Sequence, residues 1–179
     1  EDDALVEKLV EWREKNMRFF LTQFPATKER TQAWLRDRVA KDDTRILFLI
    51  FDESERMIGH FGLCDVEEKS AYMDNAIRGE AGGSPKLFDR VEITVLDFGF
   101  DKLGVEKHYG ELFADNFIAA AWHRSIGFEV EEKRTLTRVE RDGEITHVPD
   151  PDAEGKKRTQ WLIGMSKDEF YRRYPRGSR

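Results

Sequence analysis

The chain has 179 residues, 39% of them hydrophobic, which is enough for one domain around a single sizeable core. Its net charge of -6 comes from interspersed acidic and basic residues, which argues against a nucleic-acid partner, because such a partner would need a coherent basic face. The single cysteine, Cys64, excludes an internal disulfide and cannot by itself build a zinc site, and no apolar run approaches the roughly 18 residues of a membrane span. We therefore expect one cytoplasmic domain over residues 1–175, without metal, nucleic-acid or membrane partners, and a disordered tail over residues 176–179.

Two helices are predicted before the first strand. Apolar residues recur at helical spacing from about Asp3 to Leu21 and place Trp12 in the core. Pro25 ends this helix, because proline disfavours helical geometry in the residue before it. Thr27 is a suitable N-cap for a second helix, which Asp42 ends.

Three strands are predicted next. Residues 45–51 form a nearly continuous apolar run, which is typical of a strand buried on both faces. A polar turn connects this run to a second strand over residues 57–63, and the two form a hairpin. After another turn, a third strand spans residues 70–77.

A glycine-rich loop, Arg78-Gly79-Glu80-Ala81-Gly82-Gly83-Ser84-Pro85-Lys86, follows the third strand directly. Glycines let backbone N–H groups approach an anion, and a helix that begins at Ser84 or Pro85 would direct its N-terminus into the same space. This strand, loop and helix predict a pyrophosphate cradle without the lysine-serine ending of a nucleotide-hydrolysing P-loop. A solvent-exposed turn is the alternative.

The second half of the chain alternates helices and strands. The predicted elements are a helix over 86–103, a strand over 108–113, a helix from Asn116 to Ser125, a hairpin of 129–141 and 144–148 turned by Asp142-Gly143, a strand over 159–165 and a short helix with a capping box at Ser166. The apolar face of the first helix comprises Leu87, Val91, Val95 and Phe98. A long helix between strands indicates a mixed α/β fold.

Two motifs at the correct spacing carry a family resemblance. Residues 78–83 are similar to the loop Arg/Gln-x-x-Gly-x-Gly/Ala, with Ala81 in place of the first glycine. Downstream, the pattern Asn-x-x-Ala-x-x-x-Tyr-x-x-x-Gly-Phe is matched in register by Asn116, Ala119, Gly127 and Phe128. Over nearly its whole length, the chain resembles the GCN5-related N-acetyltransferase (GNAT) superfamily. The resemblance implies a central, mostly antiparallel sheet flanked by helices.

Within this superfamily, the segments 12–13, 44–50, 58–63 and 74–80 look most like enzymes that acetylate amino groups of nucleotide-activated sugars. The chain departs from the family pattern in two ways. The short strand that normally precedes the first helix is missing at the front of the domain. In addition, His123 stands where the family usually has the tyrosine that serves as general acid.

The resemblance implies direct transfer of an acetyl group from acetyl-CoA, the co-substrate, to an amine. In the family, the strand before the loop pairs with the pantetheine arm of CoA, a role that would fall here to Asn75, Ala76 and Ile77. Asn116 would contact the same arm, although it is also a suitable helix cap. The residues expected to hold the pyrophosphate are Arg78, Ala81, Gly82, Gly83 and Ser84.

Proton transfer in this reaction needs an acid for the departing thiolate and a base for the attacking amine. The register with the family tyrosine implies that His123 donates a proton or hydrogen bond to the thiolate, with a packing role as the alternative. Glu111 ranks slightly ahead of Asp74 as the base, acting through water. A solvated carboxylate at a strand edge is the alternative for each of them.

The acceptor pocket of the family lies around the first helix and its following turn. Phe20 and Phe24 lie there and could stack on a base or sugar, with packing as the alternative, while His60 could face either the core or the acceptor. The favoured acceptor is a nucleotide-linked amino sugar, which would need a closed aromatic pocket. A protein N-terminal or ribosomal-protein acetyltransferase would instead need an open groove between the first two helices and the late hairpin. The third reading is a non-catalytic acyl-CoA-binding module, and the hairpin could also extend across a partner in a homodimer.

Overall fold

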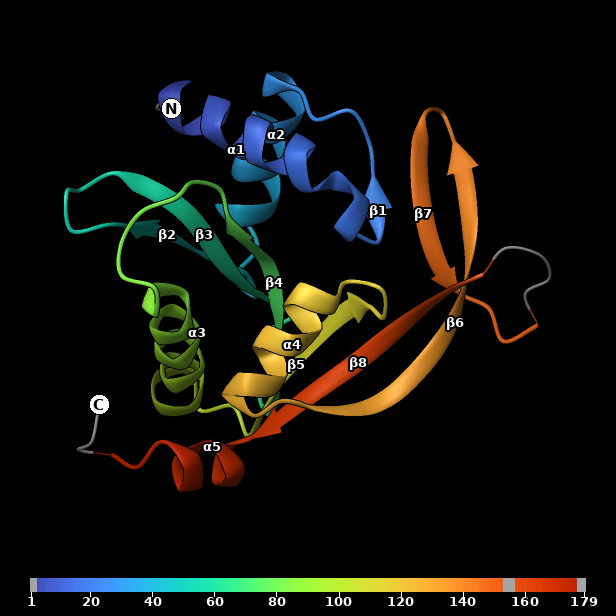
Figure 1. Cartoon of the computed structure of the whole chain (residues 1–179). Coiled ribbons are helices and arrows are strands. Elements are labelled where there is room, and N and C mark those ends of the chain that lie inside the picture. Colours follow the sequence, from blue (N-terminus) through green and yellow to red (C-terminus); the bar gives the residue numbers. More distant parts are fainter. Residues whose placement is uncertain (1–2, 153–156, 177–179) are drawn as a thin grey trace.

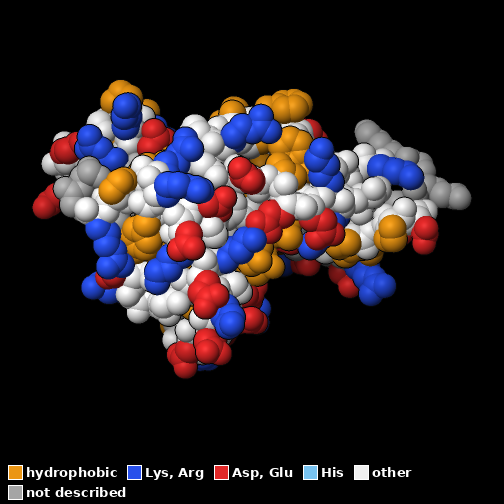
Figure 2. All heavy atoms as spheres, turned by 90° about the horizontal axis from the view of Figure 1, so that it is seen from below, with side chains coloured by type: hydrophobic (Ala, Val, Ile, Leu, Met, Phe, Trp, Pro, Cys, Tyr) orange, Lys and Arg blue, Asp and Glu red, His pale blue; other side chains and the backbone are white. Residues whose placement is uncertain are grey.

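The computed structural model describes residues 3–152 and 157–176. Of the predicted tail, residues 177–179 lie outside the described residues, while Arg176 forms an ion pair with Asp101 at 2.6 Å. Within the described ranges, no helix is long and apolar enough to cross a membrane. Figure 2 shows acidic and basic side chains interspersed over one face of the molecule, as the composition suggests.

The described residues form five α-helices arranged around one sheet (Figure 1). The helices are α1 (Asp3–Asn16), α2 (Lys28–Trp34), α3 (Leu87–Phe98), α4 (Phe117–Ile126) and α5 (Lys167–Arg173). A 3₁₀ turn, Met17–Phe19, follows α1, and π-helical turns, Leu35–Val39 and Gly99–Leu103, continue α2 and α3.

The sheet has eight strands in the order β1-β7-β6-β8-β5-β4-β3-β2 within the described residues. The strands are β1 (Thr22–Gln23), β2 (Ile46–Phe51), β3 (Met57–Cys64), β4 (Ser70–Arg78), β5 (Lys107–Phe113), β6 (Glu129–Arg141), β7 (Glu144–Pro149) and β8 (Arg158–Ser166). Every neighbouring pair is antiparallel except β4 and β5, which are parallel. The predicted mixed α/β fold with a mostly antiparallel sheet is confirmed.

Local side-chain signals set several boundaries as predicted. Thr27 and Asn116 cap α2 and α4, because the side-chain oxygen of each accepts a backbone N–H from the first turn. Ser166 and Glu169 form the reciprocal capping box of α5. Asp142-Gly143 turns the β6–β7 hairpin, with both residues at positive φ, 50° and 76°.

Two expectations about the first third of the chain are wrong. α1 ends at Asn16 rather than at Leu21, and the Asn16 amide donates a hydrogen bond to the Trp12 carbonyl at 2.8 Å. β2 is mostly half-buried instead of buried on both faces, and Phe51 at its end is 51% exposed. In the described residues no strand precedes α1, so β2 is the edge of the sheet and lacks the second neighbour that would cover it.

Both faces of the sheet are covered by helices (Figure 1). α1 packs on one face and α3 with α4 on the other, each through its own apolar cluster. The first cluster comprises Leu9, Trp12, Met57 and Ile77, and the second comprises Ile50, Ile58, Phe61, Leu63, Phe88 and Val95. A third cluster joins α4 and α5 to β8 and includes Ile126, Ile163, Met165 and Phe170. The clusters hold the helices against the strands that form the site.

The buried stripe of α3 is displaced from the predicted one. Its buried residues are Phe88, Glu92, Val95 and Leu96, whereas Leu87, Val91 and Phe98 are not fully buried. The helix therefore turns one carboxylate, that of Glu92, toward the interior. The predicted face consists of apolar residues alone, whereas the face that is buried includes the charged Glu92. The sequence pattern therefore favoured the wrong face of the helix.

Candidate active site

The sheet opens between β4 and β5. These strands pair only from Ser70 with Lys107 to Tyr72 with Tyr109. Beyond that point β4 continues beside β3, while β5 continues beside β8. The rings of Tyr72 and Tyr109 stack where the strands separate, with centroids 5.2 Å apart. One edge of β4 therefore has no strand partner among the described residues after Tyr72.

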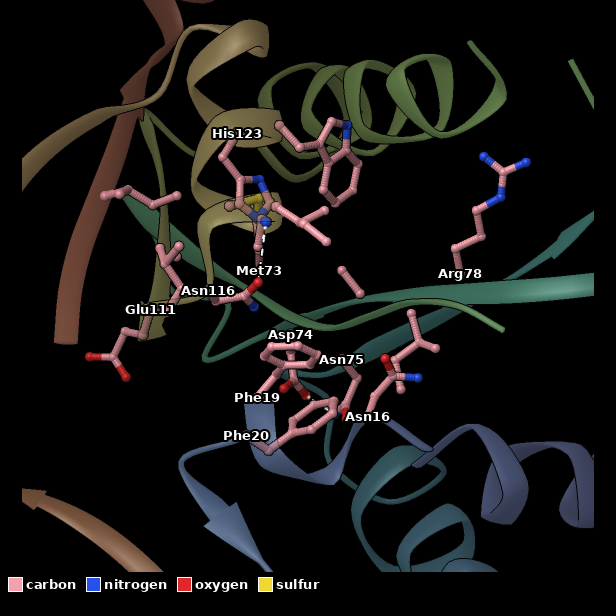
Figure 3. A pocket seen from close by; sticks show the side chains of 18 of the residues that line it. Asn16, Phe19, Phe20, Met73, Asp74, Asn75, Arg78, Glu111, Asn116 and His123 are labelled. Carbon is pink, nitrogen blue, oxygen red and sulfur yellow. Dashed lines mark hydrogen bonds between the residues drawn. The ribbon is translucent and has the colours of Figure 1, made fainter. Parts of the chain in front are cut away.

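A pocket of about 700 Å³ occupies the opening between the two strands. Its walls come from β4, β5, α4, the start of α3 and the segment that follows α1 (Figure 3). Of the predicted site residues, those that line it are residues 74–78, Glu111, Asn116, His123 and Phe20. The predicted residues that do not line it are residues 81–84, Phe24 and His60. The structure thus brings most of the predicted catalytic and cofactor residues to one pocket.

A β-bulge shapes the β4 wall of this pocket. Gly62 pairs with Asp74 and His60 pairs with Ile77, so two residues of β4, Asn75 and Ala76, lie opposite one residue of β3. Asn75 adopts a positive φ of 47°, in the left-handed region that asparagine tolerates better than most residues. Bulges of this kind change the direction of backbone and side-chain groups at functional sites.

The side chain of Asn75 is held at both ends. Its Oδ1 accepts a hydrogen bond from Arg13 Nη1 at 3.1 Å, and its Nδ2 donates to Asp74 Oδ2 at 2.7 Å. Arg13 also donates to the Thr22 carbonyl at 3.0 Å, so α1 and the segment after it support the bulge. Burial lowers the pKa of Arg13 to about 10, which leaves its guanidinium charged at neutral pH.

The glycine loop begins with two backbone N–H groups that are already engaged. Gly79 and Glu80 both donate to the Ile58 carbonyl, at 2.9 and 3.0 Å. Among the described residues, the next four N–H groups, of residues 81–84, donate no hydrogen bond. Arg78 reaches over this segment and donates to the Gly82 carbonyl at 2.9 Å. The available cradle is therefore residues 81–84, and α3 begins at Leu87 rather than at Ser84 or Pro85.

His123 lies on the α4 wall of the pocket and is 9% exposed. Figure 3 shows its imidazole pointing into the pocket toward Met73 and Asn116. Its Nδ1 lies 2.6 Å from Oε1 of Glu92, which is 0% exposed. No described residue hydrogen-bonds its Nε2, so this nitrogen is available to a molecule in the pocket.

Asn116, the N-cap residue immediately before α4, lines the pocket. Its Oδ1 accepts the Ala119 N–H at 3.3 Å, which confirms the predicted cap. Its Nδ2 donates to no described residue. The amide can therefore cap the helix and donate to a ligand at the same time.

Both candidate bases line the pocket as members of ion pairs. Glu111 Oε1 lies 3.1 Å from Nη1 of Arg134, while Asp74 forms an ion pair with Arg45 and accepts a hydrogen bond from Asn75 Nδ2. Figure 3 shows the Glu111 carboxylate at one end of the pocket, directed away from His123, and Asp74 beside Phe20. A proton from the pocket centre would reach either carboxylate through water.

The three predicted acceptor residues have different surroundings. Phe20 lines the pocket, with the Arg13 guanidinium 3.4 Å from its ring centroid. Phe24 lies outside the lining and packs under Arg30, at 3.7 Å from its ring centroid. His60 is buried against Trp12, with ring centroids 6.1 Å apart, and burial lowers its pKa to about 4. His60 therefore faces the core below α1.

Several residues of the site were not selected from the sequence. Arg13, Asn16 and Phe19 line the pocket from the end of α1 and its 3₁₀ turn. Glu92 supports His123 from α3. A signal for Glu92 was present, because it follows Phe88 and precedes Leu96 by four residues on one helical face. For the segment after α1 the signal was the family's acceptor pocket, which the resemblance places around the first helix and its following turn.

Cys64 lines the pocket wall but is not prepared for chemistry. Burial raises the pKa of its thiol to about 12, with a further contribution from the nearby carboxylate of Asp74. The thiol therefore stays protonated at neutral pH. The described part of the chain contains no group of three or more His, Cys, Asp or Glu side chains that could hold a metal ion.

Comparison with known proteins gives a consistent family and fold. The acetyltransferase (GNAT) domain family matches residues 1–129. Spermidine N-acetyltransferase from Vibrio cholerae, solved with CoA and spermine, is similar at 15% identity and a TM-score of 0.71, over 94% of this chain and 92% of that chain. N-acetyltransferase PseH from Campylobacter jejuni, solved with acetyl coenzyme A, is similar at 14% identity and a TM-score of 0.62, over 93% of each chain. No curated protein matches the sequence.

Proposed function

The chain belongs to the acetyltransferase (GNAT) family, and on this premise we propose that it transfers the acetyl group of acetyl-CoA to the amine of a small acceptor. The observation that carries the proposal is the pocket between the separating strands β4 and β5, with a free strand edge on one wall and the His123 imidazole on another. We also propose that residues 1–175 act as one domain, since a single sheet joins strands from residue 22 to residue 166.

The pocket and the adjoining loop fit acetyl-CoA at three points. The unengaged N–H groups of residues 81–84, next to Arg78, would bind the pyrophosphate. The free edge of β4 at residues 75–77 would pair with the pantetheine arm, as an added strand pairs with a sheet. The free Nδ2 of Asn116 would donate to the same arm.

The reaction forms a C–N bond and breaks a C–S bond. The amine nitrogen attacks the carbonyl carbon of the thioester, and an N–H of the bulge at residues 75–76 would polarise the carbonyl oxygen. The nitrogen loses one proton, and the CoA sulfur leaves with the electron pair of the C–S bond. His123 would give a proton to this sulfur, so that CoA leaves as a thiol.

The proton from the amine needs an acceptor. We propose Glu111 first and Asp74 second, each acting through water, because both line the pocket. Arg134 and Arg45 hold these carboxylates in place. Proton transfer through one water is compatible with a base that is not in direct contact with the amine.

We propose a nucleotide-linked amino sugar as the first acceptor. Phe20 and Tyr72 give the pocket aromatic surface on which a base or sugar can stack. β1 pairs with β7 and bridges the space between the first helices and the late hairpin. A peptide groove would need that space open, so the pairing favours a small acceptor over a protein N-terminus.

A polyamine is a second candidate acceptor, favoured by the charges of the lining. Four carboxylates line the pocket against two arginines, and an acidic lining attracts a cation. The carboxylates are those of Asp65, Asp74, Asp89 and Glu111, and the arginines are Arg13 and Arg78. The similar Vibrio cholerae enzyme was solved with spermine.

The test is acetyl-CoA binding by calorimetry, followed by thiol release with amino-sugar nucleotides, spermidine and N-terminal peptides as separate acceptors. Binding with release on an amino-sugar nucleotide supports the first acceptor, and release on spermidine alone supports the second. Release on peptides alone would transfer the proposal to a protein acceptor. Binding without release on any amine would favour a non-catalytic acyl-CoA-binding module, and no binding would overturn the assignment of the loop at residues 81–84.

A further inference from the structure

We propose that Glu92 is a positioning residue for His123: its buried carboxylate holds the imidazole with Nε2 toward the reacting sulfur and balances the charge of the protonated ring that donates from Nε2. The inference rests on the proposed function, because it concerns the same pocket. Glu92 does not line the pocket, so it would act only through the histidine.

The contact between the two side chains is specific. Oε1 of Glu92 lies 2.6 Å from Nδ1 of His123, within hydrogen-bonding distance, and Glu92 is fully buried on α3. Its other oxygen, Oε2, has no partner in the part of the chain that the structure describes. Among the described residues, the imidazole of His123 is therefore the side chain that hydrogen-bonds to the Glu92 carboxylate.

Aromatic rings hold the imidazole on its other sides. The ring of Trp122 lies 4.7 Å from that of His123, and the ring of Phe128 lies 5.7 Å from it. Asp89, one turn before Glu92 on α3, accepts a hydrogen bond from Trp122 Nε1 at 3.1 Å. α3 thus anchors both the imidazole and the ring beside it.

The contact determines which imidazole nitrogen faces the pocket. A carboxylate can only accept a hydrogen bond, so the proton lies on Nδ1 and the opposite nitrogen, Nε2, is left for the ligand. In the protonated ring, Nε2–H can be donated to the CoA sulfur while the carboxylate balances the positive charge. A tyrosine hydroxyl at this position would need no such help, whereas a histidine can carry its proton on either nitrogen. The neutral ring keeps its one proton on Nδ1 and has none to give at Nε2, so a histidine acid here must donate from the doubly protonated ring, which the carboxylate stabilises.

A packing role does not account for a carboxylate at this position. The other buried residues of the α3 stripe are Phe88, Val95 and Leu96. An apolar side chain of similar length would fill the same space without burying a charged group, and burying a carboxylate is unfavourable unless it is paired. The structure assigns that pairing to His123.

The test compares substitutions at both members of the pair. Glu92→Met keeps the length of the side chain without an acceptor, and Glu92→Gln keeps an acceptor without the charge. Each is measured alone and in a His123→Ala background. Asp97→Asn is the matched control, because it changes a carboxylate of the same helix that accepts from Tyr171 at 3.1 Å. The readouts are kcat and KM for acetyl-CoA, with chemistry limiting the rate, and ¹⁵N NMR of the histidine side chains.

We expect Glu92→Met to lower kcat about 100-fold, close to the loss in His123→Ala, and Glu92→Gln to lower it less. KM for acetyl-CoA should change less than about threefold in both, since neither variant alters the lining. In the His123→Ala background, Glu92→Met should have an effect below about twofold. Asp97→Asn should leave kcat unchanged. NMR should show a protonated Nδ1 in His123 of the wild type and a mixture of tautomers in Glu92→Met.

Three outcomes would overturn the inference. These are an unchanged kcat in Glu92→Met, an equal loss from Glu92→Met with and without His123, and an unprotonated Nδ1 in the wild type. If Glu92→Met does not fold, Glu92→Gln carries the same comparison. Absence of turnover in the wild type would refute the proposed function instead. The NMR readout needs no substrate and would still decide whether Glu92 and His123 are paired.

Discussion

The bulge in β4 predicts a measurable difference between two substitutions of Asn75. This residue has a φ of 47°, a conformation that costs a non-glycine residue about 1–2 kcal/mol and that glycine adopts freely. Asn75→Gly removes the hydrogen bonds to Arg13 and Asp74 but suits the backbone. Asn75→Ala removes the same two bonds and keeps the Cβ that makes the conformation unfavourable.

The magnitudes follow from the partners of Asn75. Hydrogen bonds to charged groups contribute about 1.5–3 kcal/mol each, and the loss is smaller here because Arg13 keeps the Thr22 carbonyl and Asp74 keeps Arg45. We expect Asn75→Gly to lower the free energy of unfolding by about 2 kcal/mol and Asn75→Ala by about 3 kcal/mol. The difference of about 1 kcal/mol corresponds to about 2–4 °C in Tm for a chain of this length.

The assay is urea unfolding and calorimetry of the two variants and the wild type in parallel, together with the Kd for acetyl-CoA. Both variants should bind acetyl-CoA more weakly, because the bulge lies on the wall that would pair with the pantetheine arm. Asn75→Gly should be the more stable of the two. Equal stability, or a more stable Asn75→Ala, would refute the reasoning from the backbone conformation.

Three other predictions concern the loop, the core histidines and the base. Gly79→Ala should weaken acetyl-CoA binding about tenfold and lower Tm, because a Cβ there would overlap a buried tryptophan ring. Gly143→Ala, with open space around it and a φ of 76°, should lose only about 1 kcal/mol, and equal thermal shifts would contradict the steric argument. Burial lowers the pKa of His60 and His108 to about 4, so the unfolded state binds more protons than the folded state between about pH 4 and 6.5. The free energy of unfolding is then largest above this window and falls as the pH drops through it, by about 2 kcal/mol per histidine at pH 5. A urea midpoint that is the same at pH 7 and pH 5 would refute this. Glu111→Gln should lower kcat and flatten the acidic limb of the pH profile, and retention of both would reject Glu111 as the base.

The element boundaries could be predicted from the sequence wherever a local interaction sets them. Thr27, Asn116 and Ser166 each cap a helix through contacts within one turn, and Gly104 ends the helical segment after α3 with a φ of 77°. Such contacts depend on neighbouring residues alone. The existence of β1 depends on a tertiary contact instead, because β1 has only two residues and its partner is β7.

The sequence could predict the pocket positions of residues 74–78, Glu111, Asn116 and His123, but not the orientation of His60 or the position of Phe24. Asn116 and His123 reach the pocket as their spacing along α4 implies. His60 could not be oriented from the sequence, because the ring that it packs against, that of Trp12, belongs to α1, far from β3 in the sequence. Phe20 and Phe24 are four residues apart in an irregular segment; Arg13 lies over both rings, and Arg30 lies closer to that of Phe24.

We expect the contact between β1 and β7 to form late in folding. The His147 N–H donates to the Leu21 carbonyl at 2.9 Å, and these residues are 126 positions apart. Contacts between such distant residues form late, since the intervening chain must first be in place. A nascent chain that has emerged as far as α4 already contains the β4 edge, the loop at residues 81–84 and the Glu92–His123 pair. β1 stays without its β7 partner until the hairpin has been synthesised, so this end of the sheet closes after the β4 edge and the loop are in place.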